Sequence, residues 1–420
     1  MSKATFNGGG GPTRTAAFEA RLKKRYRAER RFRPAGPGAV LFSVTVLVLL
    51  LATMTVNGVG GFQRATLTVP IDFGAVGLSV PEGLDETATV RTLEAQGLPE
   101  VVRFAAAEAL GEEAGEHVNP DAWRQVAREI AADPALLHRR SEFRVPASEN
   151  LASAFAGDGQ AELQSLARQL AAEGKLADRL DFGFLTRSDA TDPQQVGIWG
   201  ALKGSILTML VTLALAFPIG VLAALYLEEY APKGRWTDLI EVSINNLAAV
   251  PSIIFGLLGL AVFLWLFPNM RSAPLIGGMT LALMTMPVIV IAGRNAIKAV
   301  PPSIRDGAMA LGASPVQVVF HHVLPLALPG ILTGTIIGMA RALGETAPLL
   351  MIGMRAFVAT PPGGFTDPAT VLPVQIFLWS DEIDRGFVER TSAAIIVLLL
   401  FLLVMNGLAI YLRNRFEKKW

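Results

Sequence analysis

The sequence predicts an all-α integral membrane protein with about six transmembrane helices. Of its 420 residues, 51% are hydrophobic and only 17% are charged, whereas soluble domains are about a quarter charged. The missing charges leave five uncharged stretches, each long enough for the roughly 20 residues that cross about 30 Å of hydrocarbon. These stretches are 34–63, 204–227, 242–270, 272–293 and 391–412. A sixth apolar segment, 326–352, carries Arg341 and Glu345. Helices of a soluble core rarely stay uncharged for so long, because one face meets water.

Basic residues concentrate at both ends of the chain and predict its orientation. Residues 1–38 hold ten Lys and Arg against two acids, and the tail 413–420 holds four against one. Basic flanks stay in the cytoplasm, so both termini are predicted to be cytoplasmic. We interpret 39–62 as a retained first transmembrane helix, because no small-residue cleavage site follows it. The basic N-terminus is expected to meet anionic membrane lipid, with no nucleic acid as a partner.

Residues 63–197 form a polar insertion between the first and second transmembrane helices. The segment holds twelve basic and 22 acidic residues. Because the first helix runs outward, we expect an external, mainly helical domain. Amphipathic patterns predict helices at 120–132 and 159–173, and the Asn-Pro-Asp sequence at 119–121 predicts a capped helix start with Pro in the first turn. No motif in this domain indicates a function.

Residues 198–412 are predicted to form a core of five transmembrane helices. The expected spans are about 198–227, 239–267, 275–293, 326–352 and 391–412. A polar loop at 294–325 interrupts them. Counting inward from the first helix places this loop in the cytoplasm, in agreement with its basic residues Arg294, Lys298 and Arg305.

The cytoplasmic loop carries a spaced set of small and acidic residues. An acid and two small residues are followed by a Gly four positions later and then by a Leu-Pro pair; these are Asp306, Gly307, Ala308, Gly312 and Leu324-Pro325. The pattern resembles the "EAA" loop of ABC importer permeases, with Asp for Glu and Gly for the first Ala. In that family the loop forms two short helices that dock in a groove of the ATPase subunit. Small side chains allow such close contact, and Gly312 permits a sharp turn. The alternative is an ordinary connector between helices.

The fifth predicted span combines small residues with two charges. Gly330, Gly334, Gly338 and Ala342 recur every four residues, the spacing that lets membrane helices approach closely. On a continuous helix, Arg341 and Glu345 lie within about 60° of Gly338 and can pair. Both charges are therefore expected on the small-residue face, turned toward the bundle interior. Charges inside a membrane face a cavity or a partner, so the pair is either part of a substrate path or a structural ion pair.

Two further segments resemble one permease family. Residues 341–350 read R-A-L-G-E-T-A-P-L-L, similar to the R-x-x-G-E-T-A-P-L-L segment of PstA-type phosphate permeases. Residues 246–256 read N-L-A-A-V-P-S-I-I-F-G, similar to the family's N-L-A-G-V-P-S-I-V-F-G. The resemblance covers about 200–412 and fades in the insertion.

The resemblance implies a membrane-spanning subunit of an ATP-driven phosphate importer in the bacterial inner membrane. Its expected partners are a PstC-like permease subunit, an ATP-binding-cassette ATPase dimer and a periplasmic phosphate-binding protein. Arg341 and Glu345 would then belong to the substrate path, and the loop at 294–325 would couple to the ATPase.

Several other functions find less support in the sequence. No phosphate-cradling G-x-x-x-x-G-K-[ST] motif occurs, so ATP and Mg²⁺ are expected on the partner ATPase, with no cofactor in this chain and no enzymatic activity of its own. Adjacent His321 and His322 lack the spacing and acids of a metal site. A permease for another oxyanion, such as molybdate or sulfate, remains the nearest alternative. A membrane sensor with an external ligand site is a further one, although no cytoplasmic output domain is evident.

Overall fold

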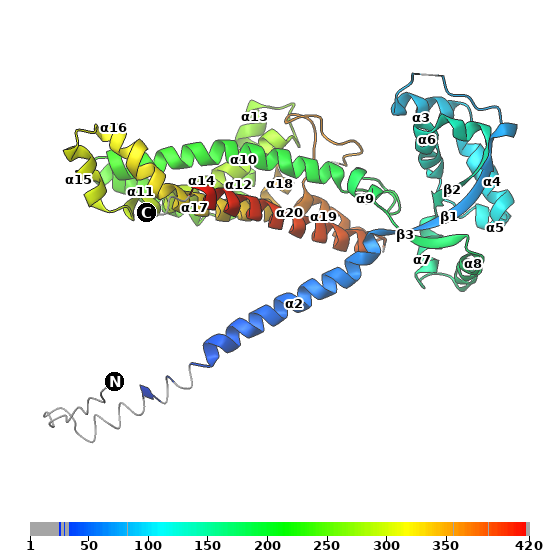
Figure 1. Cartoon of the computed structure of the whole chain (residues 1–420), viewed down its shortest axis with the longest axis horizontal. Helices are drawn as coiled ribbons and strands as arrows, with labels where there is room; N and C mark the ends of the chain where they lie inside the picture. Colours follow the sequence, from blue (N-terminus) through cyan, green and yellow to red (C-terminus); the bar gives the residue numbers. More distant parts are fainter. Residues whose placement is uncertain are drawn as a thin grey trace, which may run out of the picture. The chain divides into compact units, whose positions relative to one another are not determined.

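A computed structural model describes most of the chain and divides it into two units, residues 1–56 and 57–420 (Figure 1). The described residues are 25–26, 29, 33–81, 83–355, 357–384 and 386–416. Most of the predicted basic N-terminus and residues 417–420 of the tail lie outside them.

Within the described part of the chain, five helices are long and apolar enough to cross a membrane. They are α2 (Ala35–Gly61), α10 (Trp199–Leu225) with the π-helical turn η3 (Tyr226–Tyr230), α14 (Pro274–Lys298), the run of α16 (Pro315–Val318), η5 (Val319–Val323) and α17 (Leu324–Gly344), and α20 (Gly386–Phe416). Each overlaps a predicted span, although the run that ends with α17 begins 11 residues before the predicted 326–352 and ends eight residues before its end. The number rises to six if a bent helix pair counts as one span.

The predicted span at 239–267 is not one straight helix, because the chain bends there by 104°. Helix α11 (Arg235–Ala248) ends before Val250-Pro251, and α12 (Ser252–Leu258) begins directly after it. Proline disfavours helical backbone in the residue before it, which accounts for the break. The π-helical turn η4 (Gly259–Phe263) and the short α13 (Leu264–Leu266) continue α12.

The predicted span at 326–352 is also interrupted. Helix α17 ends at Gly344, Glu345 has extended backbone (φ −80°, ψ 116°), and a separate helix α18 covers Ala347–Met351. Pro348 has no N–H for the carbonyl of Gly344, and its ring would clash with that carbonyl in a continuous helix. Glu345 therefore lies just beyond α17 rather than on its face.

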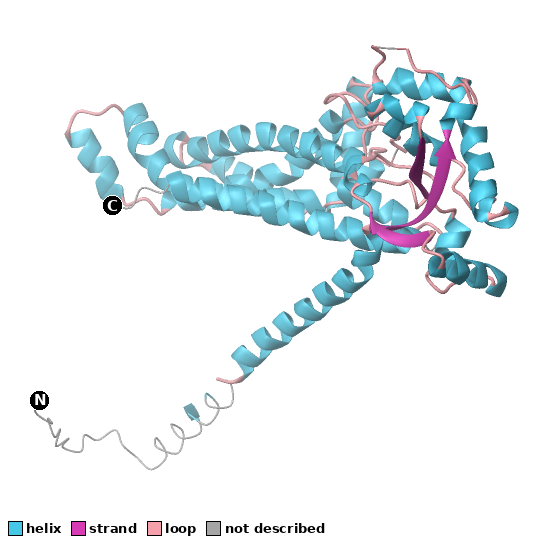
Figure 2. Cartoon of the chain, turned by 45° about the vertical axis from the view of Figure 1, so that its right-hand side comes forward, coloured by secondary structure: helices cyan, strands magenta, loops and turns pink. Residues whose placement is uncertain are grey.

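Helices α10, α14, α17 and α20 run side by side in the core of the second unit (Figures 1 and 2). Helix α14 packs closely against both α10 and α17. Close approach depends on glycines, since a Cβ at Gly278 would lie 2.4 Å from Val211 Cβ. Short helices complete the core: α15 (Pro302–Ala310) follows α14, and α19 (Leu372–Ser380), which the sequence analysis missed, precedes α20.

The insertion at 63–197 folds around a three-stranded antiparallel sheet of order β2-β1-β3 (Figure 2). The strands are β1 (Gln63–Asp72), β2 (Arg140–Pro146) and β3 (Leu176–Leu180), with Leu67 opposite both Val145 and Leu176. Inward-facing Leu67, Val69 and Ile71 are fully buried. Their period-two spacing is a strand signal that the sequence analysis overlooked.

Helices surround this sheet and make the inserted domain mainly helical, as predicted. They are α3 (Glu86–Ala95), α4 (Leu98–Leu110), α5 (Glu112–Gly115), α6 (Ala122–Ala132), α7 (Glu149–Phe155), α8 (Ala161–Ala172) and α9 (Gly183–Thr186), with short 3₁₀ turns η1 (Phe73–Ala75) and η2 (Pro134–His138). Helices α6 and α8 match the two predicted amphipathic segments.

The predicted helix start at Asn119 is wrong, because α6 begins only at Ala122. The Asn119 side chain instead accepts a hydrogen bond from the Asp121 backbone N–H at 3.0 Å and closes a local turn. Asn119 is buried and its amide donates to Asp192. The polar groups of Asn119 thus stabilise the turn before α6 and hold the segment that contains Asp192, and they do not cap the helix.

Candidate functional site

The loop that resembles an EAA loop folds as a helix, a sharp turn and a second helix. Helix α15 ends at Ala310, and Gly312 adopts φ +89°, a left-handed conformation that glycine adopts without strain. Ser314 caps α16: its hydroxyl accepts from the Gln317 backbone, and Gln317 Oε1 accepts from the Ser314 backbone at 2.9 Å. Such a capping box sets where the second helix begins. Pro325 lies in the first turn of α17, directly after η5.

The loop presents a mixed surface to its surroundings. Asp306 and Gly307 are exposed, whereas Ala308 is buried in the chain's own apolar cluster with Val318 and Val323. Ala308 therefore packs inward against the chain's own helices, and its part in seating the ATPase stays a prediction. Large apolar side chains are exposed nearby; they are Met309, Leu311 (91% exposed), Val316 and Phe320. A gathering of exposed apolar side chains is typical of an interaction surface.

An ion pair fastens this loop to the membrane helices. Arg305 of α15 donates to Glu229 at 2.7 and 3.2 Å, and the two side chains are only 22% and 12% exposed. The same guanidinium donates to the carbonyls of Val300 at 2.7 Å and Ile297 at 3.1 Å. Arg305 thus joins the start of α15 to the ends of both α10 and α14.

A second ion cluster lies beside the first. Arg294 of α14 donates to Glu228 through Nε and to Glu241 of α11 at 2.8 Å, and Lys298 lies 3.4 Å from Glu228. Glu228 and Glu229 are adjacent in η3, so one π-helical turn supplies a carboxylate to each arginine. Turns of this kind are frequent at functional positions.

The small-residue stripe of α17 packs against α14. A Cβ at Gly334 would lie 2.1 Å from Ala292 Cβ, and one at Gly338 would lie 2.9 Å from Thr285 Cγ2. Gly330 makes the same kind of approach to Ala296 at 2.7 Å, and Ala342 on this stripe is fully buried. These positions have no room for a larger residue.

The two charges of this segment pair with one another, outside the buried face. Arg341 Nε lies 3.4 Å from Glu345 Oε1, and the two side chains are 49% and 19% exposed. The expectation that both share the glycine face toward the bundle interior is wrong. Arg341 lies one turn after Ile337, which is also exposed, and Glu345 follows the end of the helix. In the chain alone, Arg341 therefore lies on an uncovered flank of α17.

The two segments that resemble PstA-type permeases pack against each other. Helix α12, which begins within 246–256, contacts α18, which begins within 341–350. A Cβ at Gly256 would lie 2.6 Å from Pro348 Cα. Gly256 thus allows the backbone of the bent helix pair to touch the backbone just after Glu345. The bend at Pro251 and the break at Pro348 belong to one packing unit.

Comparison with known proteins agrees with these features. A family model described as "Binding-protein-dependent transport system inner membrane component" matches residues 216–418. The probable ABC transporter permease protein YqgI of Bacillus subtilis is 31% identical over 260 residues, which cover 57% of this chain and 86% of that protein. The phosphate transport system permease protein PstA of Yersinia pestis is 32% identical over 224 residues, 53% of this chain and 73% of that protein. The chain belongs to the PstA-type ABC permeases.

The permease is accordingly a multi-pass inner-membrane subunit of an ABC importer, and its family implies an ATPase and a binding protein as partners. A solved inward-facing MetNI methionine ABC transporter chain superposes with a TM-score of 0.43 at 18% identity, covering 53% of this chain and 98% of that chain. A second family model, a domain of unknown function (DUF3333), matches residues 19–165 and so includes most of the insertion.

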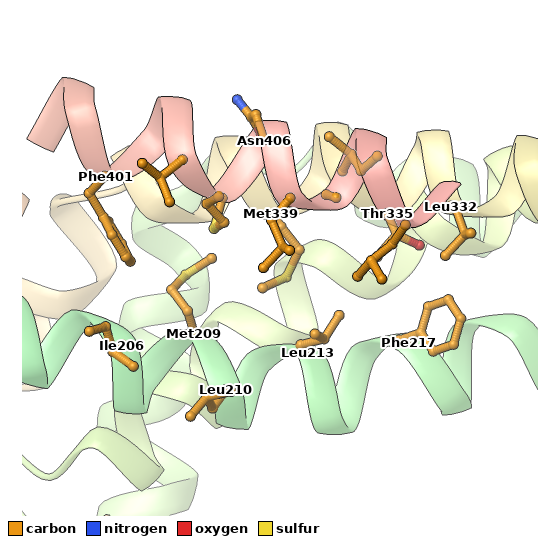
Figure 3. A pocket seen from close by; sticks show the side chains of 16 residues that line it. Ile206, Met209, Leu210, Leu213, Phe217, Leu332, Thr335, Met339, Phe401 and Asn406 are labelled. Atoms are coloured by element: carbon orange, nitrogen blue, oxygen red, sulfur yellow. The ribbon is translucent and has the colours of Figure 1, made fainter. Parts of the chain in front are cut away.

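A large apolar groove in the permease does not suit an anion. It measures about 490 Å³ and lies between α10, α17 and α20 (Figure 3). Figure 3 shows Met209 and Leu213 of α10 facing Met339 of α17 and Phe401 of α20. Thr335 and Asn406 are the polar members of its lining among the described residues. Such a lining is chemically suited to lipid chains or another apolar helix.

Sequence reasoning missed the ion pairs that hold the loop. Arg305 and Glu229 are 76 residues apart, and Arg294 and Glu228 are 66 apart. From the sequence, these arginines indicated only the orientation of the loop. No local spacing links either pair; the one available signal was adjacent acids at the end of one apolar stretch and arginines after another.

Proposed function

We propose that this permease is the PstA-like subunit of a phosphate importer and forms half of the translocation path. In this proposal it pairs with a PstC-like permease, an ATPase dimer that binds ATP and Mg²⁺, and a periplasmic phosphate-binding protein. The observation that carries the proposal is the half-exposed guanidinium of Arg341 on α17. An arginine on a membrane-spanning helix is costly against lipid, so this flank faces a partner subunit or water in the assembled complex.

The Arg341–Glu345 pair has the electrostatics that an anion path needs. Phosphate at neutral pH is a strongly hydrated anion, so its passage requires compensating positive charge. A site that holds it too tightly would not release it. Glu345, 3.4 Å from Arg341 Nε, lowers the local positive potential without abolishing it. High-affinity capture then belongs to the binding protein.

The proposed orientation has both termini in the cytoplasm and the inserted domain outside. This places the loop at 294–325 on the ATPase side, where exposed Asp306, Gly307 and the apolar side chains around Leu311 form the docking surface. Arg305 would transmit movement of that loop to α10 and α14.

Uptake of labelled phosphate by Arg341→Gln in the reconstituted complex tests the proposal. If Arg341 lines the path, the complex assembles normally but uptake is lost, and Arg341→Gln with Glu345→Gln does not recover it. If the pair is purely structural, each single change impairs assembly and the double change restores it. Arg413→Gln, near the end of α20, is the matched control and should retain wild-type uptake. Wild-type uptake by Arg341→Gln would refute the proposed role, and competition by sulfate or molybdate would reveal another oxyanion as the substrate.

A further inference from the structure

A polar pocket at the edge of the inserted domain collects arginines. It measures about 330 Å³ and lies between the start of β1, helix α6 and the segment after β3. Its lining includes Arg64, Arg128 and Arg187 together with Asp121, Asp181 and Gln125. The inserted domain as a whole is acidic, with 22 acids against twelve basic residues between 63 and 197. Three arginines around one pocket therefore run against the charge of the domain that holds them.

The carboxylates of the lining already have partners. Asp181 accepts from both terminal nitrogens of Arg187, at 3.0 and 2.5 Å, and lies 3.9 Å from the buried Arg390. Burial alone would raise the pKa of Asp181, but the hydrogen bond and charge of Arg187 hold it below its usual range. Asp121 pairs with Arg124 at 3.0 Å.

The other two arginines lack a carboxylate partner among the described residues. Arg64 donates to neutral groups, Gln125 Oε1 at 2.6 Å and the Gln194 carbonyl at 3.4 Å, and its Nε is buried without a hydrogen bond. The Arg128 side chain has no hydrogen bond or ion pair within the described part of the chain. The buried Nε–H of Arg64, which has no acceptor, costs stability.

The pKa shifts of these groups agree with the geometry. Burial lowers the pKa of Arg64, and the charges of Arg187 and Arg128 lower it further against the opposing effect of Asp181 and Asp192. Partial burial, followed by the charge of Arg187, likewise lowers the pKa of Arg128, with Glu86 opposing. Arg64, Arg128 and Arg187 line the same pocket, so an anion between their guanidinium groups would offset their mutual repulsion.

We infer that this pocket is a binding site for a small oxyanion of the phosphate class. The guanidinium group is planar, permanently charged and suited to binding two oxygens of such an anion at once. Arg64 and Arg128 supply the free donors, while Arg187, held by Asp181, adds positive potential. The site is distinct from Arg341 and does not depend on the proposed transport path. The pocket adjoins the start of α20, because Asp181 lies beside Arg390 of that helix. Arg390 also donates to the carbonyls of Gly61 and Pro193 at 2.6 and 2.8 Å.

Calorimetric titration of the purified full-length permease with inorganic phosphate tests the site. The protein carries Arg341→Gln, so that the proposed path does not contribute. We expect saturable phosphate binding, weakened about tenfold or more by Arg128→Gln or Arg64→Gln, since each removes a charge-assisted bond. Arg168→Gln on α8, whose guanidinium donates to Gln164 at 3.4 Å outside the pocket, is the matched control and should bind as tightly as its parent.

A thermal-unfolding measurement keeps the test decisive if one variant folds poorly. Phosphate should raise the melting temperature of the parent and the control, because a ligand that binds only the folded state stabilises it, and should leave that of Arg128→Gln unchanged. Arg128 is exposed, so its replacement leaves the domain core intact. Absence of phosphate binding, or equal affinity in parent and Arg128→Gln, overturns the inference. Loss of binding-protein association in Arg128→Gln without phosphate binding also overturns it, because the pocket would then receive an acidic side chain of that protein.

Discussion

Replacing Arg305 with Gln tests how the cytoplasmic loop is coupled to the membrane helices. The change leaves the Glu229 carboxylate, 12% exposed, without its partner and removes the bonds to the carbonyls of Val300 and Ile297. Removing one member of a buried ion pair costs about 3–5 kcal/mol. Because both side chains keep some exposure, we expect about 2–3 kcal/mol, which is roughly a 30- to 150-fold shift toward the undocked loop.

The assay is ATP hydrolysis by the reconstituted importer with and without substrate-loaded binding protein. Arg305→Gln should insert and assemble, but stimulated hydrolysis and uptake should fall together, because the loop no longer holds α10 and α14. Glu229→Gln should show a milder loss, since Arg305 keeps its two carbonyl bonds. Hydrogen exchange across 300–325 should rise in both variants.

Lys298→Gln provides the matched control. Its ammonium group lies 3.4 Å from Glu228 but is 55% exposed, and exposed pairs contribute only about 0–1 kcal/mol. Wild-type stimulation is therefore expected. The coupling argument fails if Arg305→Gln retains wild-type stimulation and exchange, or if Lys298→Gln is impaired as severely.

Three further predictions concern backbone geometry, helix packing and pH. Gly312→Val places a β-branched residue at φ +89° and should cost at least about 1 kcal/mol in the turn, abolishing substrate-stimulated ATP hydrolysis while membrane insertion, measured by fractionation, is kept. Gly334→Val would put a Cβ 2.1 Å from a side chain of α14 and should lower the yield of folded subunit in gel filtration, whereas Gly407→Ala, in open space on α20, should not. A hydrogen bond with Asp384, aided by burial, raises the pKa of Glu149 to about 7. The folded state therefore binds the proton of Glu149 more tightly than the unfolded state does. The resulting stabilisation of the folded state is present at low pH and is lost as the pH rises through about 7. Glu149→Gln should make the melting temperature less dependent on pH between 5 and 8, and an unchanged pH profile would contradict this.

Features governed by local composition could be predicted from the sequence. A helix in lipid must be apolar along its whole length and satisfies its own backbone groups, so the uncharged stretches alone were enough to locate α2, α10, α14 and α20. The turn at Gly312 follows in the same way, because its cause lies within a few residues. Pro251 and Pro348 are local signals for the two helix breaks, but the breaks do not show in the hydropathy because both segments are apolar on either side of the proline.

Features that join distant segments were decided only by the tertiary structure. The partner of Arg305 lies 76 residues away on the end of another helix, and the pocket arginines Arg64 and Arg128 come from a strand and a helix. The exposed flank of Arg341 depended on where α17 ends and which face α14 covers. The energy of an ion pair depends on the distance between its charged atoms. Those distances, and the burial of each side chain, are set only when the helices pack.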